Sequence, residues 1–422
     1  MNIEVNYRNK RRYNTAKAPL HQTLFWTGLI WVLSKCALLG KKYKIEKINM
    51  EDLKPPYLLL SNHMHFIDFE LAAMATWPHP VSNVVSIDGY VIKGFLLEWI
   101  GAIATRKYTN DLPLIKSIRK VLKRGDILAM YPEARYSLEG CDSFLPDSLG
   151  KMVKMLKVPV VVMCLHGNFI NCPHWNKIFK RNPIEGEMIQ VVTAQEAKTL
   201  SVEEINRRIR EAFKKDDFKW QLENKIKIDH PKRAEGLHSL LYKCASCKTE
   251  GKMYSAGTKL WCEECGKRWE MTEYGQLQAE EGETIFSHIP DWTNWERACI
   301  REEVENGTYY FEDTVRVETL PSWTKFYKQG EGKFIQTLTE TRLECNYYGE
   351  PFTLVRTPQN LDSMHIEYDY HGHGDCIDIS MPEDSFWCYT TKRDVITKIA
   401  FATEEIHKYA VKQQQAEKKL IG

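Results

Sequence analysis

The stretch from Leu58 to Asp68 constrains the fold more than any other, because a short apolar run ends there abruptly on groups that can exchange protons. Leu58, Leu59 and Leu60 are typical of the end of a buried strand, and the apolar residues after Asp68 are typical of a helix. On one continuous helix, residues five apart point about 140° away from each other, so His63 and Asp68 can meet only across a turn. The stretch therefore predicts a strand-to-helix junction, where α/β folds place functional groups.

A His–Asp pair at this junction is a candidate proton-transfer site. A carboxylate on one imidazole nitrogen fixes which nitrogen carries the hydrogen and leaves the other nitrogen able to accept a proton from an alcohol. His65 is the local alternative to His63, since it stands three residues before Asp68 and can pair with it along a helix face. A pair of this kind also occurs in purely structural roles.

The chain from residue 41 to about residue 195 alternates strand-like and helix-like segments, a pattern that predicts an α/β domain. Residues 158–164 are apolar and mostly β-branched, as expected for a strand covered on both faces. Residues 112–123 have a helical period that stops at Gly125. A charged helical segment, residues 201–228, then leads out of the alternating region.

The N-terminal end is basic, with ten Lys or Arg against two Glu in residues 1–50, although the whole chain carries a net charge of only +2. Such an end suits an anionic surface. Residues 24–39 are strongly apolar, but they number 16, include Lys35 and fall short of the roughly 20 residues that a bilayer span needs. We interpret them as a helix in a membrane interface. The alternatives are a signal peptide, for which no small-residue cleavage site follows, and a buried core helix.

Four of the twelve cysteines form two Cys-x-x-Cys pairs that are separated by 14 residues. This is the spacing of two loops that close on one tetrahedral metal ion, so the pattern predicts a metal site in a reducing compartment rather than disulfides. We expect structural zinc, with iron as the alternative, because four thiolates leave no open coordination position. The predicted ligands are Cys244, Cys247, Cys262 and Cys265.

The last third of the chain carries short aromatic and β-branched runs and ends in a helical pattern over residues 394–413. The runs are residues 309–317, 333–338, 352–357, 365–370, 376–380 and 386–390. Strands followed by one helix predict a small antiparallel barrel or sandwich closed by that helix, an order that resembles pleckstrin-homology-like modules. His365, His371 and His373 admit a metal site, but we favour a surface loop, since two of them lie in a Gly-rich turn.

Three blocks follow one another along the first half of the chain: Asn62-His63-x-x-x-x-Asp68, Tyr131-Pro132-Glu133 and Val158-Pro159-Val160. In order and spacing they resemble the glycerolipid acyltransferase family, which includes the lysophosphatidic acid acyltransferases. The resemblance covers roughly residues 20–195. It implies that His63 deprotonates the hydroxyl of an acyl acceptor, that Asp68 orients His63, and that the hydroxyl attacks the thioester of acyl-CoA or acyl carrier protein.

The resemblance also implies that Glu133 and nearby basic residues hold the glycerol-phosphate end of the acceptor. Between the first two of these blocks lies a segment that departs from the family pattern: counted from Gly101, the family's phosphate-binding Arg position falls on Lys107, with Arg106 one place earlier. Directly after Tyr131-Pro132-Glu133, Arg135 falls on the family's Thr position, Tyr136 on its Arg position, and Ala134 on its Gly position, so the turn cannot rely on glycine's freedom. The predicted acceptor-binding residues are Glu133, Arg135, Arg106 and Lys107; the alternative is that the basic ones are ordinary solvated charges.

We therefore predict an α/β protein in four parts. Residues 1–40 form a basic segment with an interfacial helix, and residues 41–235 an acyltransferase-type mixed sheet flanked by helices. Residues 236–275 form a small rubredoxin-like zinc ribbon, and residues 276–422 a C-terminal α+β domain, rich in strands, with a closing helix.

The predicted function is that of a cytoplasmic, peripheral membrane acyltransferase of phospholipid synthesis. It would transfer a fatty acyl group from a thioester to a lysophospholipid, foremost 1-acylglycerol-3-phosphate. One alternative is the same chemistry on another acceptor. The other is a non-catalytic zinc-ribbon protein that binds lipid or a partner. We expect no nucleic acid among the partners, because the ribbon segment carries Glu250, Glu263, Glu264 and Glu270 among its basic residues.

Overall fold

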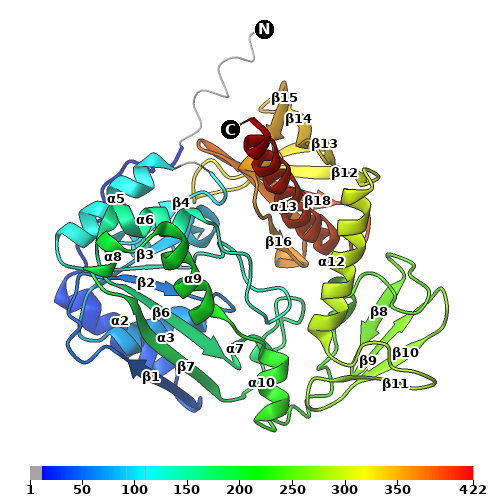
Figure 1. The fold of residues 1–422 in the computed structure, drawn as a ribbon, viewed down its shortest axis with the longest axis horizontal. Coiled ribbons are helices and arrows are strands. Elements are labelled where there is room, and N and C mark those ends of the chain that lie inside the picture. The colour runs from blue at the N-terminus through cyan, green and yellow to red at the C-terminus, as the bar shows by residue number, and fades with distance from the viewer. Residues whose placement is uncertain (1–11, 92, 110, 422) are drawn as a thin grey trace. The chain divides into compact units, whose positions relative to one another are not determined.

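The computed structural model describes residues 12–91, 93–109 and 111–421, so the first eleven residues of the predicted basic segment lie outside it. The chain forms two compact units (Figure 1). The N-terminal unit comprises Asn14–Thr105 and Asn110–Ile228. Of the described residues, the C-terminal unit comprises residues 229–421 together with residues 12–13 and the short segment Arg106–Thr109.

A seven-stranded mixed sheet forms the centre of the N-terminal unit, in the order β1-β7-β6-β2-β5-β3-β4. Neighbouring strands are parallel except β6 and β7, which are antiparallel. The strand that carries the predicted site, β2, lies in the middle of the sheet and is buried along its whole length. The strands are β1 (Tyr43–Ile48), β2 (Leu58–Ser61), β3 (Val81–Ser86), β4 (Ile103–Thr105), β5 (Ile127–Met130), β6 (Val160–His166) and β7 (Ile184–Val192).

Helices cover both faces of this sheet. On one face the core joins strand residues such as Leu58 and Val162 to α5, α6 and α9. On the other face Leu59, Val161 and Leu165 pack against α3, and α2 contacts α3. The helices of the unit are α2 (Leu24–Ala37), α3 (Ile67–Thr76), α4 (Gly94–Trp99), α5 (Leu112–Lys123), α6 (Ser148–Leu156), α7 (Asn168–Asn171), α8 (Glu196–Thr199), α9 (Val202–Phe213) and α10 (Asp217–Glu223).

Helix α2 keeps much of its apolar surface in solvent. Leu24 and Phe25 are 75% and 70% exposed, and the short helix α4 adds the exposed Phe95 and Trp99 beside it. The two helices touch through Trp26 and Trp99, whose ring centroids lie 5.6 Å apart. The core-helix alternative for this segment is therefore wrong. None of the helices in the part of the chain that the structure describes is both long and apolar enough to cross a membrane.

The C-terminal unit begins with a small antiparallel sheet, ordered β11-β10-β9-β8, that carries the four paired cysteines. Trp269 of β10 packs edge-on against Trp292 of the following helix, with ring centroids 5.0 Å apart, and both indoles are buried. The small sheet is thereby attached to the rest of the unit. The strands of the small sheet are β8 (Met253–Ala256), β9 (Lys259–Cys262), β10 (Arg268–Met271) and β11 (Leu277–Ala279). Helix α11 (Leu237–Leu240) precedes them in the chain and α12 (Ile289–Glu305) follows them.

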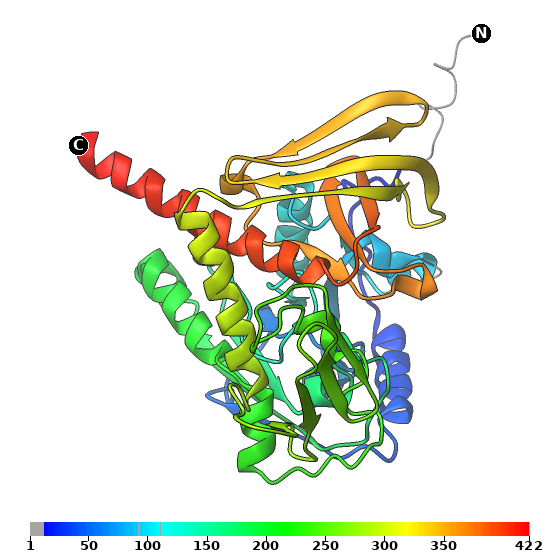
Figure 2. The same ribbon diagram turned by 90° about the vertical axis from the view of Figure 1, so that its right-hand side faces the viewer.

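A seven-stranded antiparallel sheet follows, in the order β15-β14-β13-β12-β18-β17-β16. The long helix α13 (Ile396–Ile421) packs along α12, where Arg301 Nε lies 2.7 Å from Glu405 Oε2 (Figure 2). Together with the mixed sheet and the cysteine-bearing sheet, this arrangement confirms the predicted fold class. The strands are β12 (Tyr310–Thr319), β13 (Tyr327–Thr337), β14 (Thr341–Tyr347), β15 (Glu350–Arg356), β16 (His365–Glu367), β17 (Cys376–Met381) and β18 (Asp384–Thr390).

The surface-loop expectation is wrong for one of the three histidines. His365 lies buried on β16, with Nε2 3.3 Å from Glu367 Oε1, because its strand pairs with the buried strand β17. His371 and His373 are exposed, as expected.

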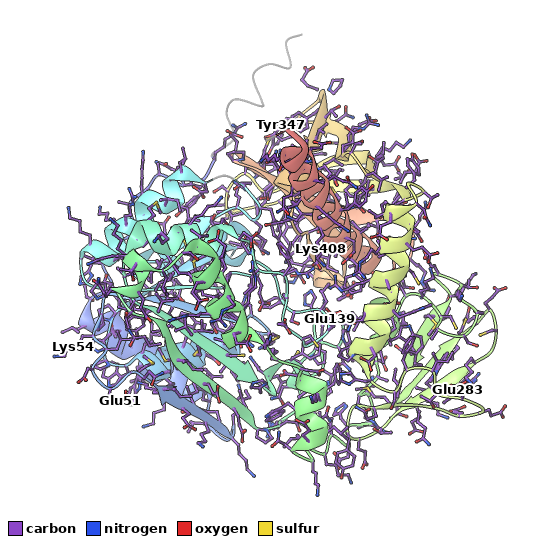
Figure 3. All side chains as sticks on the ribbon, in the orientation of Figure 1. Glu51, Lys54, Glu139, Glu283, Tyr347 and Lys408 are labelled. Carbon is purple, nitrogen blue, oxygen red and sulfur yellow. The ribbon has the colours of Figure 1, made fainter. Side chains whose placement is uncertain are left out.

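The segment Arg106–Thr109 directly follows β4 in the chain, yet it belongs to the C-terminal unit. The buried guanidinium of Arg106 donates to Leu320 O, Pro321 O and Ser385 Oγ, each at 2.9 Å. Nearby, Tyr347, labelled in Figure 3, donates its hydroxyl to Asp384 Oδ2 at 3.0 Å. Burial raises the pKa of Asp384 to about 6, and the charge of Arg106 opposes that rise.

We predict that Arg106→Ala destabilises the C-terminal unit by about 3 kcal/mol, because two buried carbonyls and a hydroxyl lose their donors. Urea unfolding of the full chain measures this loss, with Lys107→Ala as the neighbouring control and a smaller expected effect. If Arg106→Ala kept full stability and lost only acceptor affinity, the guanidinium would serve the acceptor rather than this unit.

Candidate active site and metal centre

The turn after β2 is held to β6 by one asparagine. The buried Asn62 donates its amide to Leu165 O and accepts a hydrogen bond from Leu165 N, both at 2.9 Å. Leu165 lies at the end of β6, which pairs with β2 in parallel. Strand β2 ends at Ser61 while β6 continues to His166, and the residues that follow Asn62 leave the sheet at its carboxyl edge.

His63 and Asp68 meet across this turn. His63 Nδ1 lies 3.1 Å from Asp68 Oδ2, and the side chain of Asp68, the second residue of α3, is fully buried. The same carboxylate oxygen accepts the backbone N–H groups of Met64 at 2.7 Å and His65 at 3.0 Å. The Asp68 Oδ2 atom thus lies within hydrogen-bond distance of three nitrogen atoms. The side chain of His63 is 24% exposed, so its ring remains accessible from solvent.

The alternative histidine contacts Asp68 through its backbone. The ring of His65 accepts from Ile67 N at 3.4 Å and lies 5.9 Å from the Phe179 ring, between centroids. Burial lowers the pKa of His65, which disfavours a charged pair. Of the two imidazoles, the structure pairs that of His63 with the carboxylate.

Residues 131–137 form an aromatic wall beside His63. The Tyr131 ring stacks on the imidazole with centroids 4.0 Å apart, and the Tyr136 ring lies 4.4 Å from it. Ser137 N donates to His63 O at 2.9 Å, which ties this segment to the turn. Burial keeps the pKa of Tyr131 well above its usual value, so its phenol stays neutral. The wall restricts the directions from which a substrate can approach the imidazole.

Ala134 adopts a backbone conformation that favours glycine. Its φ of +54° lies in the left-handed region, where an L-residue is strained by about 1–2 kcal/mol. Ala134 N nevertheless donates to Tyr131 O at 3.1 Å and closes the turn. The turn therefore forms without glycine, at the cost of local strain.

Glu133 is a buried carboxyl close to the histidine pair. Its Oε2 accepts from Ser143 Oγ at 3.0 Å. Burial raises the pKa of Glu133 to about 7; the charges of Lys215 and Arg135 and the Ser143 bond oppose the rise, and the charge of Asp68 adds to it. Arg135 is buried on the same segment. His63, Asp68, Glu133 and Arg135 thus belong to the N-terminal unit, whereas Arg106 and Lys107 belong to the C-terminal unit.

The sequence pattern does not indicate two further residues of this site. Lys215 is fully buried, with Nζ 3.0 Å from Leu165 O and 3.2 Å from Asp217 Oδ1, so it shares the Leu165 carbonyl with Asn62. Asn168 donates its side-chain amide to Asp68 Oδ1. Lys215 lies in a charged segment that looks solvated in sequence, and Asn168 lies 100 residues from its partner. No local signal identifies either residue.

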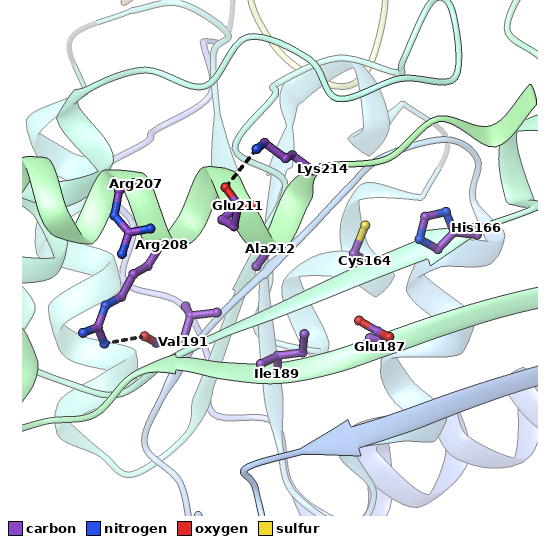
Figure 4. A pocket seen from close by; sticks show the side chains of 10 residues that line it. All are labelled: Cys164, His166, Glu187, Ile189, Val191, Arg207, Arg208, Glu211, Ala212 and Lys214. Atoms are coloured by element: carbon purple, nitrogen blue, oxygen red, sulfur yellow. Dashed lines mark hydrogen bonds and ion pairs between the residues drawn. The ribbon is translucent and has the colours of Figure 1, made fainter. Parts of the chain in front are cut away.

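An open groove of about 370 Å³ lies on the face of the sheet that α9 covers (Figure 4). Because side chains alternate along a strand, Cys164 and His166 face this groove while Leu165 faces the opposite core. His166 Nδ1 lies 3.5 Å from Asp217 Oδ1, which connects the groove to the buried Lys215. The remaining lining residues are Glu187, Ile189, Val191, Arg207, Arg208, Glu211, Ala212 and Lys214.

The four predicted metal ligands form one cluster in the C-terminal unit. Their sulfur atoms all lie within 4.8 Å of one another, with 3.8 Å between Cys244 Sγ and Cys265 Sγ and 3.7 Å between Cys247 Sγ and Cys262 Sγ. Sulfurs about 2.3 Å from a central ion at tetrahedral corners would be about 3.8 Å apart. The cluster therefore fits a metal ion held by four sulfurs.

In comparisons with known proteins, no protein-family model and no curated protein matches the sequence. Among solved structures, the chain is similar to that described as the crystal structure of the 1-acyl-sn-glycerophosphate (LPA) acyltransferase, PlsC, from Thermotoga maritima. The sequence identity is 16%, the TM-score is 0.39, and the match covers 44% of this chain and 76% of that chain.

We predict a pH-dependent stability effect from Glu133. Because its folded pKa of about 7 exceeds the ordinary value of 4.5, its contribution to stability is fully present below pH 4.5 and is lost as the pH rises through 7. The side chain of Glu133→Gln stays neutral at every pH. Between pH 4.5 and pH 8 the free energy of unfolding of this variant should therefore rise by about 3 kcal/mol relative to that of the parent.

Denaturant unfolding at several pH values measures the Glu133→Gln effect. Glu51→Gln, at an exposed carboxylate labelled in Figure 3, serves as a control with no expected trend. A stability difference between Glu133→Gln and the parent that did not change with pH would contradict the prediction.

We also predict that Cys262→Ser removes the bound metal and loosens the small sheet, because three sulfurs hold the ion less tightly than four. Elemental analysis counts zinc and iron per chain, and hydrogen exchange of the backbone amides of β8 to β11 reports whether the small sheet has loosened. The free Cys345, distant in sequence from the cluster, gives the control variant Cys345→Ser. Purified parent protein without either metal would rule out the prediction.

Proposed function

We propose that the N-terminal unit is an acyltransferase in which His63 acts as general base toward the hydroxyl of a lipid acceptor. The observation that carries this proposal is the imidazole held by a buried carboxylate, with His63 Nδ1 3.1 Å from Asp68 Oδ2 and part of the ring exposed. The family resemblance of the three sequence blocks supports the same chemistry. No serine or cysteine nucleophile is needed, because the acceptor supplies the attacking oxygen.

The proposed reaction proceeds by addition and elimination. Asp68 accepts a hydrogen bond from Nδ1–H of His63, so Nε2 carries the lone pair and takes the proton of the acceptor hydroxyl. The hydroxyl oxygen attacks the thioester carbonyl, forming the new C–O bond and a tetrahedral oxyanion. Collapse of this species breaks the C–S bond, and the proton on His63 passes to the departing thiolate. The products are the ester and the free thiol of CoA or acyl carrier protein.

The proposed acceptor is a lysophospholipid, foremost 1-acylglycerol-3-phosphate. Support comes from Glu133 and Arg135, which lie on the segment that packs against His63 and offer a hydrogen-bonding carboxyl and a guanidinium for the polar end of the acceptor. Another acceptor is the main alternative, because Tyr136 occupies the family's Arg position and Arg106 is bonded within the C-terminal unit.

We further propose that the protein works on the cytoplasmic surface of a membrane and that its metal is structural zinc. The exposed side chains of Leu24, Phe25, Phe95 and Trp99 form an apolar face on α2 and α4, and such a face can enter the boundary between head groups and acyl chains. Four sulfur ligands leave no open position for substrate, so the metal would stabilise the small sheet rather than take part in acyl transfer.

The proposal is tested by incubating purified protein with vesicles, labelled acyl-CoA or acyl-carrier protein, and a panel of lyso-acceptors. We expect ester formation that His63→Ala lowers by at least about 100-fold, with His65→Ala as the matched control that retains most activity. Transfer to another acceptor, with none to 1-acylglycerol-3-phosphate, would move the proposal to its alternative substrate. Equal activity of His63→Ala and the parent would favour the non-catalytic, lipid-binding alternative.

We predict that Asp68→Asn lowers kcat by about 10³–10⁴-fold with little change in KM, because the amide no longer selects the correct imidazole tautomer. Steady-state kinetics with acceptor-containing vesicles measure both constants. Glu70→Gln, at the next carboxyl along α3, is the control and should retain activity. A parallel loss of kcat and acceptor affinity would argue against an orienting role for Asp68.

A further inference from the structure

The second oxygen of the Asp68 carboxylate has its own donor. Oδ2 faces His63 Nδ1 and the two backbone N–H groups of the turn, while Oδ1 accepts the side-chain amide of Asn168. Both Asp68 and Asn168 are fully buried. The carboxylate is therefore held at both ends by different elements, the turn after β2 and the start of α7.

The backbone around Asn168 is fixed by tight packing. Gly167, directly before it, has a φ of +78°, and a Cβ there would lie 2.5 Å from Pro183 O, so only glycine fits. Phe169 N, directly after it, donates to Asp217 Oδ2 at 3.2 Å. These constraints direct the Asn168 side chain at Asp68.

Asn171, a second asparagine in α7, has a structural role and serves as a comparison for Asn168. Asn171 donates to Gly167 O and Asn182 O, each at 3.1 Å, and its oxygen accepts from Asn182 N at 2.7 Å, so its amide braces the backbone. The amide oxygen of Asn168, by contrast, has no hydrogen-bond partner among the residues that the structure describes. The contact that fixes the Asn168 amide is its donation to Asp68.

We propose that Asn168 is a positioning residue for the reaction: by holding Asp68 Oδ1 it keeps Oδ2 aligned with His63 Nδ1. An aspartate carboxyl rotates about a broad torsional minimum, and a donor on each oxygen removes that freedom. Supporting residues of this kind set the orientation and tautomer of the group they serve. The catalytic meaning of the inference rests on the proposed function, but the geometry of the pair can be tested without it.

The kinetic test compares Asn168→Ala with Asn171→Ala. We expect Asn168→Ala to lower kcat about 10–100-fold, the range seen when the hydrogen-bond partner of a metal ligand is removed, while KM changes less than twofold. Asn171→Ala should lower the unfolding temperature and leave kcat within about twofold. Equal kcat for Asn168→Ala and the parent, or the same kcat loss in both variants, would overturn the proposal.

Asn168→Asp supplies a pH signature that a merely structural role would not produce. At low pH the new carboxyl is protonated and can donate to Asp68 Oδ1, whereas two adjacent carboxylates cannot both ionise without repulsion. The kcat of this variant relative to the parent should therefore fall as the pH rises, while circular dichroism shows an unchanged folded fraction. A ratio that is constant with pH would count against the proposal.

Nitrogen NMR of the His63 ring gives a readout that does not require activity. The parent should show a single tautomer with the hydrogen on Nδ1, and Asn168→Ala should show a mixture of tautomers. If the parent transfers no acyl group but the tautomer still changes, the positioning contact stands and the proposed function fails. If Asn168→Ala keeps the single tautomer, the positioning role is wrong whether or not the protein is an acyltransferase.

Discussion

The fully buried carboxylate of Asp68 is the constraint on which the site depends. A buried charge is tolerated only when hydrogen bonds replace the water that it has lost, and here the donors are two backbone N–H groups of the turn, the His63 imidazole and the Asn168 amide. To supply them, residues 62–68 must fold into one particular turn and α7 must begin beside that turn. The position of the His63 imidazole follows from this requirement, because the ring is one of the hydrogen-bond partners of the Asp68 carboxylate.

A second group of buried charges lies beneath this turn. Lys215 and Asp217 are both fully buried and 3.2 Å apart, and the Leu165 carbonyl joins Lys215 to Asn62. Burying an ion pair seldom adds stability compared with apolar residues of the same size. Its effect here is to define geometry, because the end of β6, the start of α7 and the start of α10 are bonded to the same few polar groups.

Local patterns were enough to predict much of the fold. The bounds of α5 can be predicted because helix caps and hydrophobic periodicity act over a few positions. The cysteine cluster can be predicted because the Cys-x-x-Cys spacing is equally local. The segment over residues 201–228 instead divides into α9 and α10, because Asp216 caps a new helix. The polar strand β14 is not indicated by its composition. Asn168, Lys215 and the burial of Arg106 depend on partners 50 to 279 residues away, which no local pattern reports.

The path of the backbone through Arg106–Thr109 has a consequence for synthesis on the ribosome. These four residues emerge well before their partners, since Leu320 follows Arg106 by 214 positions and Ser385 by 279. Domains generally fold in the order of their translation. The mixed sheet can therefore assemble before the residues that bond to Arg106 have been synthesised. Arg106 can make these hydrogen bonds only after the last strands have been synthesised. A chain terminated before Leu320 would leave the Arg106 guanidinium without these acceptors.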